Sequence, residues 1–95
     1  MTESLIDTAS LDTRRRRLIF RAWHRGIREM DLILGRYVDT HIQMLNVTEL
    51  DELEYIMSFE DRDLLAWLMG EDTPPHDINT PIFHALLATH QPSYL

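Results

Sequence analysis

The chain has 95 residues, a net charge of −7 and no cysteine, and 44% of its residues are hydrophobic. This length and composition predict one folded domain with a small core, and the lack of cysteine excludes disulfides and thiolate metal sites. No apolar run approaches the ~18 residues that a membrane-spanning helix needs.

The charge is distributed unevenly along the chain. All nine basic residues are arginine, and eight of them lie in residues 1–40 beside six acidic residues, so this part carries +2. Residues 41–95 hold one arginine and ten acidic residues, which gives −9. Residues 1–11 contain acids and no long apolar segment, which fits neither a secretory signal nor a mitochondrial transit peptide. We therefore expect a flexible N-terminal tail over residues 1–11 and a bacterial cytoplasmic location rather than a mitochondrial matrix.

The first predicted elements are two helices separated by a glycine. A short apolar stripe over residues 18–23 indicates a helix that packs by one face. Gly26 then breaks the phase of the pattern. A longer stripe follows over residues 27–45, with the three- and four-residue spacing of an amphipathic helix. We expect this second helix to be the longest in the molecule.

The third predicted helix has a capping signal at its start. Asn46 is expected to stop the long helix, and Thr48 to cap the next one. Asp51, three residues after Thr48, would complete a capping box with Asp in place of the usual Glu or Gln. The apolar stripe of this helix covers residues 50–57.

A fourth helix and a linker follow in the predicted order. Ser58 is the expected cap of the fourth helix, with Asp61 three residues on, and apolar residues occupy 64–68. Gly70 should end this helix, since glycine is favoured just after a helix. Residues 71–77, "EDTPPHD", predict a rigid linker, because consecutive prolines cannot continue a helix.

The last predicted helix completes an all-α fold. Thr80 should cap it, with Pro81 at the favoured first position. No segment has the period-two alternation of a strand. The sequence therefore predicts an all-α fold, a small antiparallel bundle of about five helices, formed by residues 12–91 as one domain and followed by a C-terminal tail over residues 92–95.

Motifs of known enzyme classes are missing from the sequence. The five histidines lack zinc-site spacing, and there is neither a nucleophile elbow nor a glycine-rich phosphate loop. The acidic clusters flank predicted helix starts, where they favour the helix dipole. We therefore expect a protein that is not an enzyme and that binds neither a metal nor a cofactor stably.

Four consecutive arginines, Arg14, Arg15, Arg16 and Arg17, raise the alternative of a nucleic-acid-associated helical regulator. Four residues in one helical turn point around the axis, and a sequence pI of about 5.0 does not fit a basic face. We therefore expect no nucleic acid as a partner. A generic helical adaptor is a further alternative.

Residues 25–29, "RGIRE", form the segment that we call the RGIRE corner. Glycine adopts the left-handed conformation at no steric cost, so Gly26 should turn the chain sharply between the first two helices. That turn would bring Arg25 and Glu29 onto a convex corner. An Arg–Glu pair on one helix would contribute only about 0.2–0.5 kcal/mol. Two interpretations stay open: a helix end with solvated charges, and a corner that docks on a partner.

The RGIRE corner and its surroundings resemble a known family. An RGxxE motif, preceded by "RRRRLIFRAWHRG" and followed by "REMDLILGRYVD" and "DRDLLAWLMG", is similar to the succinate dehydrogenase assembly factor 2 family, called SdhE in bacteria. Trp67 corresponds to the tryptophan of that family. The resemblance covers about residues 14–70 and is weakest after Gly70.

The resemblance implies a small helical bundle that binds the flavoprotein subunit of succinate dehydrogenase, or of a related fumarate reductase. Such a factor promotes covalent attachment of FAD to a histidine of its client and acts as a chaperone, with FAD held by the client. We expect the free protein to be monomeric. By position, the family motif implies these partner-binding residues: Arg25, Gly26, Glu29 and Asp31, with Arg21, Arg28 and Tyr37 as neighbours.

Overall fold

The computed structural model describes residues 11–90, and it contains five α-helices and no strand within that range. The predicted all-α bundle of about five helices is confirmed. The predicted tails lie outside the described residues except for Leu11, which is partly buried against the core. Every helix in residues 11–90 is too short or too polar to cross a membrane.

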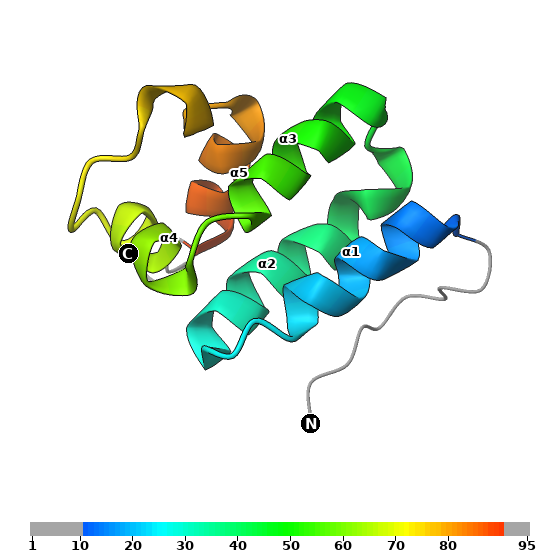
Figure 1. Ribbon diagram of the computed structural model, residues 1–95, viewed down its shortest axis with the longest axis horizontal. Coiled ribbons are helices and arrows are strands. Elements are labelled where there is room, and N and C mark those ends of the chain that lie inside the picture. Colours follow the sequence, from blue (N-terminus) through cyan, green and yellow to red (C-terminus); the bar gives the residue numbers. More distant parts are fainter. Residues whose placement is uncertain (1–10, 91–95) are drawn as a thin grey trace.

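Helices α1 (Thr13–Trp23) and α2 (Arg28–His41) form an antiparallel hairpin and lie side by side along most of their length (Figure 1). Asp12 caps α1, since its carboxylate accepts a hydrogen bond of 2.8 Å from the backbone N–H of Arg15. As predicted, α2 is the longest helix. Its α-helical part ends at His41 and a 3₁₀ turn, Ile42–Met44, occupies the rest of the predicted stripe.

Helix α3 (Val47–Met57) starts two residues earlier than predicted. Asn46 caps it, accepting 2.8 Å from the N–H of Glu49, while the Glu49 side chain accepts 2.9 Å from the N–H of Asn46. The predicted box of Thr48 and Asp51 was wrong. Asn46 with Glu49 has the same three-residue spacing and offers the longer Glu side chain that such boxes prefer.

Helix α4 (Asp61–Leu68) begins three residues after the predicted cap. Ser58 instead ends α3, and its hydroxyl donates 2.6 Å to the carbonyl of Tyr55. The predicted end is confirmed: Gly70 has φ +77° and its N–H donates to the carbonyl of Trp67 at 3.2 Å. The next N–H, of Glu71, donates 2.8 Å to Ala66, which completes a Schellman motif.

Helix α5 (Pro81–His90) contacts α2, α3 and α4 and so closes the core (Figure 1). The predicted cap is confirmed, since the Thr80 hydroxyl accepts 3.2 Å from the N–H of Phe83. The linker before it contains a 3₁₀ turn, His76–Ile78, which the sequence did not predict, and Ile78 is fully buried. All buried side chains in the described part of the chain are apolar. The polar groups available for function therefore lie at the surface.

A second glycine sets the distance between α1 and α2. A Cβ added to Gly35 would lie 2.4 Å from the Cδ2 atom of Trp23, so the ring packs directly on the α2 backbone. The Trp23 indole N–H also donates 3.2 Å to the carboxylate of Asp39. This contact fixes the hairpin whose connection forms the RGIRE corner.

Candidate functional site

The backbone of the RGIRE corner is open to solvent at Gly26. This glycine is exposed, has φ +102°, and would meet no atom within 4 Å if it carried a Cβ. The predicted sharp turn at Gly26 is confirmed. A partner surface could therefore approach the main chain closely at this position.

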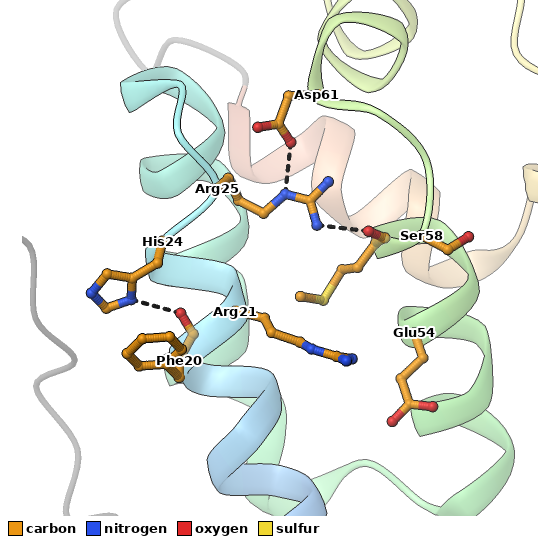
Figure 2. Close-up of a pocket in the computed structure, with 8 residues that line it drawn as sticks. Phe20, Arg21, His24, Arg25, Glu54, Ser58 and Asp61 are labelled. Carbon is orange, nitrogen blue, oxygen red and sulfur yellow. Dashed lines mark hydrogen bonds and ion pairs between the residues drawn. The ribbon is translucent and has the colours of Figure 1, made fainter.

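Arg25 points into the molecule (Figure 2). Its guanidinium donates 2.6 Å to the carboxylate of Asp61, 2.6 Å to the carbonyl of Met57 and 2.9 Å to the carbonyl of Phe59. The Arg25 side chain is 13% exposed and that of Asp61 is 12% exposed. We expected Arg25 and Glu29 on a convex corner, whereas the ion pair of Arg25 is with Asp61.

The other members of the corner lie at the start of α2. Glu29 and Arg28 are exposed, and Asp31 is half-buried. Ile27, at the cap position of α2, makes no side-chain capping bond. The two acids of the first turn, Glu29 and Asp31, complement the positive end of the helix dipole. One carboxylate oxygen of Asp31 accepts 2.6 Å from the backbone N–H of Arg25. Glu29 and Arg28 are thus the charged side chains that the corner presents to solvent.

A surface groove of about 490 Å³ lies beside the corner, between α1 and the end of α3 (Figure 2). Phe20 and Arg21 of α1 line it together with His24, the residue after α1, and Phe20 is 62% exposed and stacked on the His24 ring at 4.1 Å between centroids. Arg21 is exposed in the last turn of α1. The remaining lining residues are Arg25, Glu54, Met57, Ser58 and Asp61.

Arg14, in the arginine-rich start of α1, forms an ion pair with Glu54, a residue that lines the groove. Two hydrogen bonds from Arg14, of 2.8 and 2.9 Å, hold the pKa of the Glu54 carboxyl below its usual value, and Arg21 acts in the same direction. The Arg14 guanidinium also donates 2.6 Å to Asp51, and these partners raise its own pKa. Arg14 and Arg21 of α1 therefore favour the ionised form of Glu54 on the α3 side of the groove and offset part of its charge.

Tyr37 is not a surface residue. Its side chain is 4% exposed and its ring stacks on His41 at 4.3 Å between centroids. Burial, followed by the charges of Glu49 and Glu52, raises the pKa of the phenol. Tyr37 was expected to be a neighbour in partner binding, but α2 turns this position toward the core, so it offers little surface to a partner and that role stays a prediction.

The run of four arginines does not form one basic surface. Arg14 pairs with Asp51 and Glu54 of α3. Arg15 pairs with Asp12 at 2.5 Å, and also donates to the carbonyl of Ile42 at 2.8 Å and to the carbonyl of Leu45. Arg16 and Arg17 are exposed. Half of the run thus holds the bundle together.

Sequence analysis missed Asp61, Phe20 and His24 as parts of this region. Asp61 appeared there only as a residue of a capping pattern, and its contact with Arg25 spans 36 residues of sequence. Phe20 could have been found, because it does not lie on the apolar face of Leu18, Ile19, Ala22 and Trp23, and its large ring is 62% exposed. Among the described residues, no three His, Asp or Glu side chains could hold a metal ion together. The groups that the corner and groove offer are suited to binding another surface.

These features define a class, namely a small all-α protein with an apolar core and a polar, glycine-containing corner on its surface. Comparison with known proteins identifies the family to which the chain belongs. The sequence model of the family described as flavinator of succinate dehydrogenase matches residues 16–90. The chain belongs to this family.

Relatives with curated names agree with this assignment. The FAD assembly factor SdhE of Acetobacter pasteurianus is 36% identical over 78 residues, which cover 82% of this chain and 72% of the relative. The mitochondrial succinate dehydrogenase assembly factor 2 of Arabidopsis thaliana is 32% identical over 85 residues, covering 85% of this chain and 45% of the relative. The chain thus spans less than half of the plant protein. No solved structure matches the chain.

Proposed function

We propose that the chain is an assembly factor that binds the flavoprotein subunit of succinate dehydrogenase and promotes covalent attachment of FAD to it. The observation that carries this proposal is the family match over residues 16–90, which includes the whole RGIRE corner. The names of the bacterial and plant relatives, an FAD assembly factor and a succinate dehydrogenase assembly factor, support it. The corresponding subunit of fumarate reductase is a second client of the same kind.

The corner supports a binding mechanism. We propose that Gly26, Arg28 and Glu29 make the direct contacts, since the glycine backbone and both charges are exposed. Asp31 and Arg25 shape the corner from within, and Arg21 extends the surface along the groove. A factor that binds one client conformation more tightly than the others shifts the population toward it. Such a shift would hold the client histidine and the flavin in reactive geometry.

The chain itself acts as a chaperone rather than an enzyme in this proposal. The new covalent bond joins FAD to a histidine of the client, and FAD stays with the client throughout. We also propose that the free chain is monomeric and acts in a bacterial cytoplasm, which the bacterial relative supports. A nucleic-acid partner receives no support, because Arg14 and Arg15 are engaged within the bundle.

The test is covalent flavinylation of the client subunit in cells that lack this chain. Client protein is purified with and without co-expression of the chain, separated on a denaturing gel, and examined for flavin fluorescence. We expect fluorescence only with co-expression. Glu29→Ala should weaken client binding by about tenfold or more, since a charged hydrogen-bonding group contributes about 1.5–3 kcal/mol.

Arg36→Ala is the matched control for Glu29→Ala, because Arg36 is another exposed charge on α2 that lies away from the corner in sequence. It should leave both client binding and client fluorescence unchanged. Equal fluorescence with and without the chain would overturn the proposed function.

A further inference from the structure

The connection between α1 and α2 has little backbone bonding of its own. In the described chain, it is joined to the helices by two backbone hydrogen bonds, one at each end: His24 to Arg21 at 3.3 Å and Asp31 to Ile27 at 3.0 Å. Gly26 between them has positive φ and open space around it. The conformation of this segment must therefore depend on side-chain contacts.

Arg25 supplies those contacts to three separate segments. Its backbone N–H donates to Asp31 in α2. Its guanidinium donates to the carbonyl of Met57 in α3 and to the carboxylate of Asp61 at the start of α4 (Figure 2). The planar guanidinium can satisfy several acceptors at fixed angles, as lysine cannot. Arg25 thus fastens the corner to the junction of α3 and α4.

Asp61 is the only ionic partner of Arg25 in the described residues, and this pair is the least exposed of the ion pairs there. Removing one partner of such a pair leaves the other charge poorly solvated, which favours rearrangement of the segment that carries it. The segment that carries Arg25 is the corner. Loss of Asp61 should therefore change the shape that the corner presents.

We propose that Asp61 is a positioning residue for the RGIRE corner and acts through Arg25. It sets the direction of Arg25, and Arg25 in turn holds Gly26 and the start of α2 in the geometry that the client meets. This inference rests on the proposed function, since it assigns Asp61 a part in client docking without direct contact. The start of α4 is thereby coupled to a motif 36 residues away in sequence.

The test combines hydrogen exchange on the free chain with binding to the purified flavoprotein subunit. Asp61→Ala should accelerate exchange of the Arg25 amide by about tenfold or more, because that amide is bonded only while the corner keeps its shape. The same variant should weaken client binding by about tenfold. Asp61→Asn keeps an acceptor for the guanidinium, so it should show a smaller increase in amide exchange and a smaller loss of client binding. This variant replaces Asp61→Ala in the test if Asp61→Ala does not fold.

Asp63→Ala is the matched control, since it removes an exposed carboxylate from the same turn of α4. It should leave exchange and binding within about twofold of the wild type. In a double-mutant cycle, adding Asp61→Ala to Arg25→Ala should change binding by less than about twofold, because both act on one contact. Losses that multiply would mean that Asp61 touches the client directly and would overturn the inference.

The two hypotheses fail separately. If the wild-type chain does not bind the subunit, the proposed function is overturned, whereas faster exchange of the Arg25 amide in Asp61→Ala still supports the positioning of the corner. If exchange in Asp61→Ala matches that in Asp63→Ala, the positioning inference is overturned whatever the client does.

Discussion

Neighbouring residues of the RGIRE corner have opposite surroundings. Arg25 is 13% exposed and bonded to the interior junction of α3 and α4, whereas Gly26 is exposed with free space around it. A five-residue motif therefore divides into an inner part that fixes the shape and an outer part that offers contacts. Substitutions at the two positions should be distinguishable by whether stability or binding changes more.

Gly26 gives the first prediction at this scale. Gly26→Ala and Gly26→Arg should both lower the free energy of unfolding by about 1–3 kcal/mol, because φ +102° strains any side chain that has a Cβ. Gly26→Arg should in addition abolish client flavinylation, since its side chain would occupy the approach to the backbone. Urea denaturation measures the first effect and gel fluorescence of the client the second. Equal activity of the two variants would contradict a docking role for this backbone.

Among the helices, the packing of α1 against α2 depends on the close contact between the Trp23 ring and Gly35. Trp23 covers Gly35, and a Cβ there would lie 2.4 Å from the ring. In an isolated helix, alanine is more stable than glycine by about 1 kcal/mol. Within this hairpin the steric conflict with Trp23 should outweigh that preference, so that alanine at position 35 lowers the stability of the protein.

Gly35→Ala should therefore destabilise the protein by about 1–3 kcal/mol, the usual cost of overpacking a core. Thermal unfolding followed by circular dichroism measures the loss. In a Trp23→Leu background the smaller side chain removes the conflict, and Gly35→Ala should become neutral or stabilising. Destabilisation of equal size in both backgrounds would mean that the ring is not the cause.

The same elements indicate how far the sequence could predict the structure. Apolar periodicity located all five helices, and Gly70 and Thr80 were correct as a helix end and a cap because these are local effects. The caps at Thr48 and Ser58 were wrong, because several residues nearby satisfy the same short pattern. Gly35 went unnoticed, since a single glycine within a helical stripe does not reveal which ring will cover it.

The candidate site was predictable only in part for a related reason. The turn at Gly26 follows from local backbone preference and was confirmed. The direction of Arg25 depends on two carbonyls and one carboxylate that lie 32–36 residues away. The length and charge of the Arg25 side chain do not show which of the ten acids in residues 41–95 it will pair with. The burial of Tyr37 likewise depends on which face of α2 the other helices cover.

Across the whole molecule, ion pairs join the arginine-rich beginning to the acidic remainder. Arg14 reaches Asp51 and Glu54, and Arg25 reaches Asp61. The two parts carry +2 and −9, so these pairs offset part of the repulsion among the acids. The bundle should consequently respond to pH through the carboxylates that are paired.

Glu54 gives the prediction at this scale. Its folded-state pKa lies below the usual 4.5, first because of the hydrogen bonds from Arg14. A carboxyl of this kind adds stability above its unfolded pKa and loses it as the pH falls through its folded pKa. We expect the melting temperature to fall as the pH drops below about 4.5, and Glu54→Gln to show a smaller fall. Glu60→Gln, at an exposed position, is the control and should follow the wild type.

The contacts of Arg25 also order events during synthesis of the chain. Met57, Phe59 and Asp61 are made 32–36 residues after Arg25, so a growing polypeptide that has just completed α2 has Asp31 to bond the Arg25 amide but none of the acceptors of the Arg25 guanidinium. Ribosomes add about 5–20 residues per second, so this gap lasts for seconds. We expect the nascent chain to become competent for its client only once α4 has emerged from the ribosome. The client would then meet finished factors and not chains still under translation.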